Sequence, residues 1–324
     1  MRAARLWQGR NDLVLEDIDV PEVPPGWALV RVEAAGLCRT DLHLMDGVRF
    51  TTRFGRDYTV ARPRVLGHEI AGTVTAVGDG VGSVAVGQRV AAGGRRTPGT
   101  SPGLHIDGGF AEFCALPATH LVPVPDHVSL DAAAVATDSV LSAFVAVTRA
   151  GAVRPGETVG IIGLGALGSS GLRTAVLRGA TVYGVDVDAS RHGAAEALGA
   201  AGCFDDVEAL ADVAPSLIVD FVGGATTRTA LDVVQPGGRV VVVGLDAHDI
   251  TVDSFALVLG RKSLVGSLGS DHTSDFEAVV RHLAAGDFQP QVEVIGFDEL
   301  NAGFDRLRRG DVRGRLVVRP AGPA

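Results

Sequence analysis

The stretch T158-V-G-I-I-G-L-G-A-L-G168 decides the fold of the second half of this chain. An apolar run over 158–162 predicts a buried strand, and the glycine pattern that follows it opens a predicted helix reaching about Gly179. In this order the first glycine permits a tight turn, the second lets the backbone approach a pyrophosphate, and the third lets helix and strand pack closely. The free N–H groups at the helix start then face the phosphates. The predicted dinucleotide contacts are Gly163, Gly165, Leu167 and Gly168.

The segments after this motif continue the alternation of strand and helix. Apolar runs at 181–185, 217–222 and 239–243 are each followed by a helical or turn-rich stretch. Continuous apolar strands joined by helices are typical of βαβ units and of a parallel sheet covered on both faces. Residues 139–267 are therefore predicted to form a doubly wound Rossmann domain of the α/β class. Val243 and Gly244 would lie at the carboxyl edge of its sheet, where cofactors bind.

An acidic residue ends the second strand of this domain. Asp186 stands 23 positions after Gly163, where a carboxylate accepts hydrogen bonds from ribose hydroxyls and repels a 2′-phosphate. NAD is therefore expected in preference to NADP. Arg191 slightly weakens this preference, because an arginine nearby can accommodate a phosphate. An ordinary glycine-rich turn with a surface aspartate is the alternative, and the order of strand, turn, helix and acid disfavours it.

The first part of the chain has a different pattern of apolar residues, one that is typical of strands. Period-two or β-branched runs at 30–33 and 71–77 predict strands, and turns rich in Gly and Pro separate them. The tail contains one predicted helix over 275–285 and one strand, G314-R-L-V-V318, which is too little for a domain of its own. We therefore expect two domains, namely 1–138 completed by 268–324, and 139–267.

Composition excludes several classes of function. The 324 residues are 46% hydrophobic and carry 29 basic against 38 acidic side chains, which argues against a general nucleic-acid or membrane binder. No apolar run approaches the roughly 20 residues that cross a bilayer, and the N-terminus lacks the apolar core of a signal peptide. We therefore expect a cytoplasmic protein. Three dispersed cysteines are too few for a disulfide framework, so each is a core residue, a metal ligand or a nucleophile.

Three residues far apart in the sequence are candidate metal ligands. Cys38 lies in C38-R-T-D-L-H43, His68 in G67-H-E69, and Asp138 in A136-T-D-S139. Zinc prefers nitrogen and sulfur ligands and tolerates carboxylate oxygen, and a catalytic zinc needs three protein ligands and one open position. Spacing alone does not establish the site, because an inert buried cysteine and an ordinary surface or core histidine are the commoner identities of such residues.

These elements together resemble the medium-chain, zinc-dependent alcohol dehydrogenase family. They span nearly the whole chain in the family's order and spacing, which makes the match specific to the family and not to a substrate. The resemblance implies a GroES-like β-rich catalytic domain beside the Rossmann domain, and an oxidoreductase that acts on CH–OH groups with NAD. The matched elements are C38-R-T-D-L-H43, G67-H-E69, G108-G-F-A-E112, the region of Asp138, G163-L-G-A-L-G168 with Asp186, and G314-R-L-V-V318.

The resemblance assigns the zinc ligands residue by residue. Cys38 and His68 match the first two, and Asp138 matches a third position that is often Cys and is Asp in some relatives. An Asp138 that only caps the following helix is the alternative. Glu69 matches the family's displaceable fourth ligand, with hydrogen bonding outside the coordination sphere as its alternative.

A second metal is not expected. Many relatives hold a structural zinc with four closely spaced cysteines, and residues 91–110 contain none. Cys114 alone cannot bind that ion. We therefore expect one catalytic zinc per subunit and a mobile loop over 93–107.

The resemblance also implies the roles of four further residues. The zinc would act as a Lewis acid on the substrate oxygen while a hydride passes between carbon and nicotinamide. Thr40 would bridge the substrate oxygen to the nicotinamide ribose, and His43 would pass the proton to solvent. A surface histidine is the alternative for His43. Arg39 matches a pyrophosphate contact and Ser142 a nicotinamide contact.

The segment between Cys38 and His68 is longer than in many relatives. Residues 46–64 include five arginines with three aromatic residues between them. A solvated loop whose arginines pair with acids is the commoner identity of such a segment. The more specific hypothesis is that one or two of these arginines bind a polar or anionic substrate. We expect a secondary alcohol, or a polyol or sugar-type substrate.

Two other functions stay open at this point. A zinc-free quinone or enoyl reductase of the same fold is disfavoured by Cys38, His68 and Asp138 occurring together, and a non-catalytic NAD-binding relative by the intact relay residues. The expected partners are a small-molecule alcohol or ketone and a second copy of the chain. The resemblance implies a strand-to-strand contact near 240–244 and 263–267 for the homodimer or homotetramer.

Overall fold

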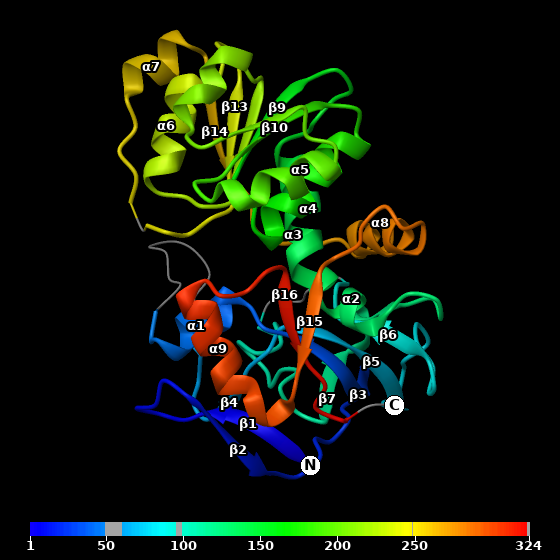
Figure 1. Ribbon diagram of the computed structural model, residues 1–324. Coiled ribbons are helices and arrows are strands. Elements are labelled where there is room, and N and C mark those ends of the chain that lie inside the picture. Colours follow the sequence, from blue (N-terminus) through cyan, green and yellow to red (C-terminus); the bar gives the residue numbers. More distant parts are fainter. Residues whose placement is uncertain (49–59, 95–98, 248, 323–324) are drawn as a thin grey trace. The chain divides into compact units, whose positions relative to one another are not determined.

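The chain forms two compact units (Figure 1). The computed structural model describes residues 1–48, 60–94, 99–247 and 249–322. The first unit contains Met1–Asp138 and Ser270–Ala324, and the second contains Ser139–Gly269. The C-terminal tail is thus part of the first unit. The second boundary lies two residues later than the sequence analysis placed it.

A six-stranded parallel sheet is the centre of the second unit. Its order, β11-β10-β9-β12-β13-β14, starts from the middle with β9 and proceeds outward in both directions. This change of direction between β9 and β12 is the topological switch point at which open α/β sheets bind ligands. The strands are β9 (Thr158–Ile162), β10 (Thr181–Val185), β11 (Gly202–Phe204), β12 (Leu217–Asp220), β13 (Arg239–Val242) and β14 (Ser263–Gly266).

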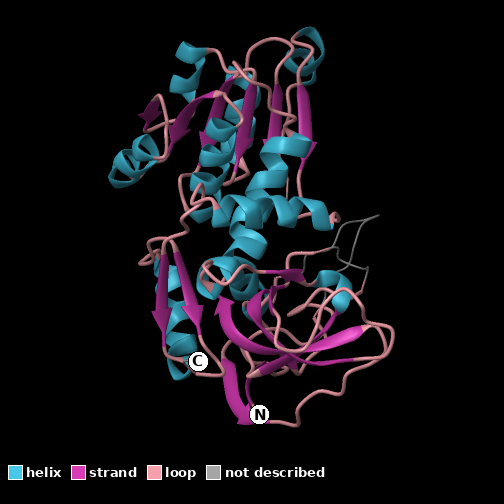
Figure 2. Ribbon diagram, turned by 90° about the vertical axis from the view of Figure 1, so that its right-hand side faces the viewer, coloured by secondary structure: helices cyan, strands magenta, loops and turns pink. Residues whose placement is uncertain are grey.

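Helices cover both faces of this sheet (Figure 2). The neighbours Ile161 and Ile162 in β9 belong to two different hydrophobic clusters, because successive side chains of a strand point to opposite faces. Leu172 of α4 (Ala166–Leu177) packs in the first cluster and Leu231 of α6 (Ala225–Val233) in the second. The predicted doubly wound fold is confirmed. The remaining helices of this unit are α3 (Leu141–Val145), α5 (His192–Ala197), α7 (Ser254–Leu259) and the 3-10 helices Ala189–Arg191 and Glu208–Val213.

The first unit is built around the long strand β3 (Trp27–Gly36). It pairs with β5 (Glu69–Val77), β7 (Phe113–Pro117) and, at its end, with β16 (Arg315–Val318). β15 (Val292–Ile295), β6 (Arg89–Ala91) and β8 (Val122–Pro123) complete this sheet, and β1 (Arg2–Leu6), β2 (Leu13–Asp17) and β4 (Arg64–Val65) form a second one. The helices are α1 (Arg39–Met45), α2 (Leu130–Val135), α8 (Thr273–Ala284), α9 (Leu300–Arg309) and the 3-10 helices Ala118–His120 and Phe297–Glu299.

One helical run is long and apolar enough to span a membrane by length and composition. It covers Leu130–Ala150, 21 residues, and 67% of its most apolar window is buried inside the protein. The expectation that no apolar segment approaches this length was wrong. The reason is that a buried core helix rich in alanine and valine can have the same length and mean hydropathy as a membrane-spanning helix. Two π-helical turns, Ala136–Val140 and Ala146–Ala150, lie within this run.

The third glycine of the G-x-G-x-x-G turn, Gly168, is needed for α4 to pack closely against Gly163. A Cβ atom at Gly168 would lie 1.6 Å from the carbonyl oxygen of Gly163, whose φ of 83° is itself in the left-handed region. Gly168→Ala should lower the free energy of unfolding by about 1–3 kcal/mol, because the backbone of the turn must move. Denaturant unfolding of the purified variant measures this difference.

The matched control is Gly193→Ala in α5, where a new Cβ meets no atom within 4 Å. This variant should not be destabilised, since alanine is about 0.5–1 kcal/mol better than glycine inside a helix. Equal unfolding midpoints for the two variants would contradict the close approach of α4 to Gly163.

Candidate active site

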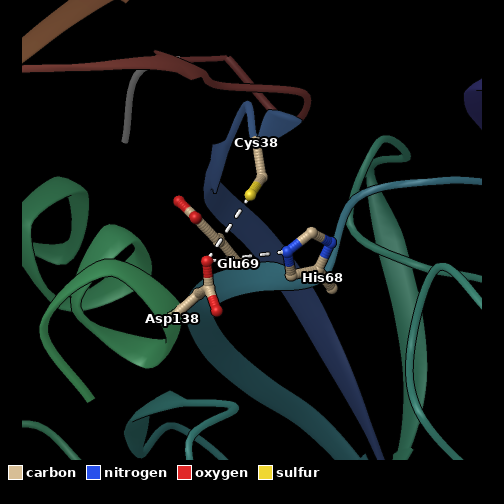
Figure 3. Close-up of side chains that lie close together, drawn as sticks. All are labelled: Cys38, His68, Glu69 and Asp138. Atoms are coloured by element: carbon tan, nitrogen blue, oxygen red, sulfur yellow. Dashed lines mark hydrogen bonds and ion pairs between the residues drawn. The ribbon is translucent and has the colours of Figure 1, made fainter. Parts of the chain in front are cut away.

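Four side chains that bear metal-binding atoms lie together in the first unit (Figure 3). One ligand atom from each of Cys38, His68, Glu69 and Asp138 lies within 4.8 Å of the others. The Sγ atom of Cys38 is 3.5 Å from Oδ2 of Asp138, and Nε2 of His68 is 3.9 Å from the same oxygen. Within the described ranges of the chain, this is the one group of three or more such residues. The structure thus brings together all four predicted ligands.

The ends of two paired strands position three of these residues. Cys38 follows β3 and is the N-cap residue of α1. His68 immediately precedes β5, and Glu69 is its first residue and the direct cross-strand partner of Gly36. The antiparallel register of β3 and β5 therefore places the thiol, the imidazole and one carboxylate at the same end of the sheet.

Asp138 comes from an unusual helical turn. It lies in the π-helical turn Ala136–Val140, inside the continuous run from Leu130 to Ala150. It precedes α3, as predicted, but the chain is already helical at Asp138. The helix-capping alternative was wrong, because the N-cap of α3 is Val140. Single π turns inside α-helices occur frequently at functional sites.

Asp41 orients two ligand residues, a role that was not predicted from the sequence. Its Oδ1 atom accepts a hydrogen bond from Nδ1 of His68 at 3.2 Å, and its Oδ2 atom accepts one from the backbone N–H of Cys38 at 3.2 Å. The carboxylate is fully buried. With Nδ1 engaged, the other ring nitrogen of His68 is directed to Cys38 and Asp138, as in carboxylate–histidine–metal arrangements. The available signal was a carboxylate three residues after a candidate ligand, within C38-R-T-D41.

Arg315 is the second functional residue that the sequence analysis missed. It begins β16, all four residues of which are buried. Its Nη2 atom donates to Oδ2 of Asp138 at 3.1 Å and to Glu69, and lies 3.4 Å from Sγ of Cys38. A buried guanidinium is costly unless anionic groups surround it, and here they do. The available signal was one arginine in the apolar strand R315-L-V-V318.

The electrostatic environment reflects the crowding of acidic groups. Burial raises the pKa of Glu69 to about 8, with Arg315 opposing this shift and Asp138 adding to it. Burial disfavours the charged form of His68, yet Asp41 and Asp138 outweigh burial and hold the pKa of His68 well above its ordinary value. The His68 shift shows that the neighbouring carboxylates favour a positive charge on the ring, whereas the Glu69 shift follows mainly from burial.

The donor set fits a zinc ion. Thiolate, imidazole and carboxylate are its usual ligands, and bonds of about 2.0–2.3 Å in a tetrahedron place ligand atoms roughly 3.3–3.8 Å apart. The separations of 3.5 and 3.9 Å are close to that range. In addition, Oε2 of Glu69 is buried without a hydrogen-bond partner among the described residues, although buried polar atoms normally have one.

The predicted relay residues lie on α1, beside Cys38. The Oγ1 atom of Thr40 is 3.7 Å from Sγ of Cys38, and its side chain is half-buried. His43 is half-buried in the last turn, and Arg39 is exposed at the first position. Thr40 is thus next to the ligand cluster, and the roles of His43 and Arg39 stay predictions.

The predicted cofactor contacts lie in the second unit, around the carboxyl ends of β9, β10 and β13. Asp186 follows β10, and its Oδ2 atom accepts hydrogen bonds from the N–H of Leu164 at 2.7 Å and from Nη1 of Arg191 at 3.2 Å. A Cβ atom at Gly165 would lie 3.6 Å from that same nitrogen. Arg191 and Asp186 therefore form an ion pair beside the glycine turn.

The other residues of this set occupy three elements. Leu167 is half-buried in the first turn of α4, and Ser142 is buried in α3. Val243 and Gly244 directly follow β13, and their N–H groups donate to the carbonyl oxygen of Asp220.

The arginine-rich segment is only partly within the described residues. Arg49, Phe50, Arg53, Phe54, Arg56 and Tyr58 lie outside them. Arg62 donates to the backbone carbonyl oxygens of Arg10 and Leu44, and Arg64 pairs with Asp107. These two arginines therefore hold neighbouring loops in place.

The described residues of the predicted mobile loop (93–107) pack against the rest of the first unit. Residues 95–98 lie outside the described part, whereas Leu104 is buried in the core of the first unit. Gly103 approaches the backbone of Gly67 so closely that a Cβ atom would lie 2.9 Å from its nitrogen.

A parallel doubly wound sheet with a glycine turn, joined to a β-rich unit with a cluster of metal-binding side chains, defines a two-domain α/β dehydrogenase. Family models agree with this architecture. The alcohol dehydrogenase GroES-like domain matches residues 24–126, and the zinc-binding dehydrogenase domain matches residues 166–285. The chain belongs to the medium-chain, zinc-type alcohol dehydrogenase family, and it is an NAD-dependent alcohol dehydrogenase of that family. The resemblance stated from the sequence is confirmed.

Individual relatives are similar over nearly their whole length. An alcohol dehydrogenase of Geobacillus stearothermophilus is 31% identical, over 98% of this chain and 99% of the relative. The acetophenone reductase of Geotrichum candidum, solved in complex with NAD, has a TM-score of 0.87 and 31% identity, over 98% of this chain and 96% of that one. A thermostable alcohol dehydrogenase of Pyrobaculum aerophilum, solved with cobalt and zinc bound, has a TM-score of 0.88 and 25% identity, over 99% of each chain.

Proposed function

We propose that this dehydrogenase uses one catalytic zinc, held by Cys38, His68 and Asp138, to interconvert a secondary alcohol and a ketone with NAD. The observation that carries the proposal is the convergence of one thiol, one imidazole and one carboxylate, with Glu69 beside them. Three ligands leave a position for the substrate oxygen, as catalytic zinc sites require.

The bound ion supplies Lewis-acid polarisation of the substrate oxygen. The residues of the chain prepare the site for it. Asp41 holds the His68 ring so that Nε2 is turned to the cluster. A Cys38 thiolate and an Asp138 carboxylate together offset the formal charge of a divalent cation. Thr40, 3.7 Å from the Cys38 sulfur, and His43 on the same helix are the proposed route for the proton.

The substrate class is the less specific part of the proposal. The acetophenone reductase among the relatives is named for a ketone, which supports a secondary alcohol as the reduced substrate. A polyol or sugar-type substrate rests on the arginine-rich segment, most of which lies outside the described residues. Assays of secondary alcohols, polyols and sugar alcohols with NAD distinguish these classes. The proposed enzyme is cytoplasmic, with no nucleic-acid or membrane partner, and cell fractionation tests this location.

The zinc proposal predicts that Asp138→Ala removes both the metal and the activity. The purified wild-type chain should contain one zinc per subunit, and a chelator should abolish NAD reduction until zinc is restored. The variant should lose zinc affinity by more than tenfold, because a carboxylate ligand is lost outright. Metal analysis and competition with a chromophoric chelator measure this.

Asp126→Ala is the matched control, since that carboxylate is fully exposed. It should retain zinc and activity. A wild-type enzyme that reduces NAD with no bound metal would contradict the proposal and favour the zinc-free reductases of the same fold.

NAD preference is proposed to depend on the charge of Asp186. Its carboxylate would repel the 2′-phosphate of NADP, while Arg191 beside it would attract that phosphate. Asp186→Asn removes the charge and keeps an acceptor for the N–H of Leu164. The ratio of kcat/KM for NAD over that for NADP should fall roughly tenfold or more, because like charges in contact cost several kcal/mol. Ser190→Ala, on the exposed turn nearby, is the control and should leave the ratio unchanged.

A homo-oligomer is also proposed, with β14 as its contact strand. β13 is paired on both sides, so residues 240–242 do not lie at an edge, whereas β14 is the last strand of the sheet. Exposed apolar side chains accompany it, namely Phe255, Val258 and Leu259 on α7 and Leu264 on β14. An apolar patch at an open sheet edge supports pairing with a second copy.

Leu259→Glu should therefore reduce the solution mass from that of an oligomer towards that of a single chain, as measured by light scattering. Val86→Glu, at an exposed apolar position of the first unit, is the control and should leave the mass unchanged. A single-chain mass for the wild-type protein would refute the proposed oligomer.

A further inference from the structure

The orientation of the ligand His68 depends on the residue before it. The backbone N–H of Gly67 donates to Oδ1 of Asp41 at 3.1 Å. The same oxygen accepts the hydrogen bond from Nδ1 of His68 at 3.2 Å. Because both residues are bound to one carboxylate oxygen, a displacement of the Gly67 backbone changes the direction of the His68 ring.

Backbone hydrogen bonds attach the segment 101–110 to this stretch of chain. The N–H groups of residues 108–110 donate to the carbonyl oxygens of residues 65–67, at 2.8 to 3.0 Å. In the other direction, the N–H of Val65 donates to Oδ1 of Asp107 at 3.0 Å. The segment is therefore held against the residues that lead into His68, chiefly by its own backbone.

Two glycines of the segment contact Gly67 where no side chain fits. A Cβ atom at Gly103 would lie 2.9 Å from the nitrogen of Gly67, the atom that donates to Asp41. A Cβ atom at Gly108 would lie 2.2 Å from the carbonyl oxygen of Gly67. The segment thus packs against the peptide groups on both sides of Gly67. A side chain at either glycine must displace backbone atoms, because a close-packed interior leaves no spare room.

Phe110 packs on Gly67 as well. The φ angle of Gly67 is 91°, and a Cβ atom there would lie 2.8 Å from Cδ1 of Phe110. Phe110 is fully buried, and its ring packs edge-on against Phe304 with 5.8 Å between the ring centroids. Gly67 therefore contacts both a ring of the hydrophobic core and the two glycines of the same segment.

We propose that Gly103 and Gly108 are positioning residues for the metal ligand His68, acting through the backbone of Gly67 and the carboxylate of Asp41. This inference rests on the proposed zinc site. Coupling between two sites is reciprocal, so an ion that fixes His68 also stabilises the attached segment. The segment 101–110 is in this sense part of the metal centre, although the four grouped ligand residues all lie outside it.

Gly103→Ala tests the proposal, and Gly99→Ala is its matched control. The φ angles of the two glycines are 73° and 77°, so both alanines are under the same backbone strain. Only Gly103 approaches Gly67, since a Cβ atom at Gly99 meets no atom within 4 Å. Gly103→Ala should bind zinc roughly tenfold to hundredfold more weakly than Gly99→Ala, the range produced by changing groups that orient a ligand. Competition with a chromophoric chelator measures this ratio.

Cobalt in place of zinc reports the geometry of the centre without turnover. The visible absorption bands of cobalt-loaded Gly103→Ala should be shifted from those of the wild-type protein, because the His68 nitrogen meets the ion from a changed direction. The bands of Gly99→Ala should match the wild-type bands. A loss of overall stability alone does not shift the bands of the folded protein.

Hydrogen exchange in the wild-type protein tests the reciprocal effect and needs no variant. One equivalent of zinc, added to the metal-free protein, should slow exchange at the N–H groups of residues 108–110 by roughly tenfold or more. The reason is that an ion that binds only the closed arrangement stabilises it by mass action. The N–H groups of α5, in the second unit, are the control and should exchange equally fast with and without zinc.

Equal zinc affinities and equal cobalt spectra for Gly103→Ala and Gly99→Ala would overturn the inference. Exchange at residues 108–110 that zinc leaves unchanged would overturn it too, and this measurement decides alone if Gly103→Ala does not fold. These outcomes leave the zinc proposal intact, because the wild-type chain still binds its ion. A wild-type chain that binds no zinc or cobalt refutes the proposed function itself.

Discussion

The antiparallel register at the end of β3 is the constraint on which the candidate active site depends. Gly36 lies opposite Glu69 on one side and opposite Val317 on the other. A shift of either neighbour by one residue would turn its side chains to the other face of the sheet. Glu69 would then leave the ligand cluster, and Arg315 would leave its anionic partners. One strand end, therefore, fixes residues that are more than 200 positions apart in the sequence.

This dependence explains which parts could be predicted from the sequence. The fold of the second unit could be predicted from local patterns, because each of its strands, turns and helices has a recognisable pattern in consecutive residues. The runs at 158–162 and 181–185 match β9 and β10 residue for residue. The fold of the first unit and the ligand set were predicted through resemblance to a family, since no spacing rule joins Cys38, His68 and Asp138.

The features that were missed share a physical reason. Arg315 reaches Glu69 across 246 positions, and no pattern in R315-L-V-V318 states what the arginine contacts. Asp41 was visible in the motif, yet the hydrogen bonds it accepts from His68 and from the backbone N–H of Cys38 depend on how β5 and α1 meet. The π turn at Asp138 adds one residue to a helical turn, which hydrophobic periodicity does not resolve.

Arg315 also bears on whether the fold needs its metal. Thiolate and carboxylate groups buried without a cation would be strongly destabilising, as they are in small domains that fold only with zinc. Here the guanidinium already contacts Cys38, Glu69 and Asp138, so one positive charge stays in the cluster whether or not an ion is bound. The strands that carry the ligands also belong to a continuous hydrophobic core. From this charge balance and this core we expect the first unit to fold without a bound metal ion.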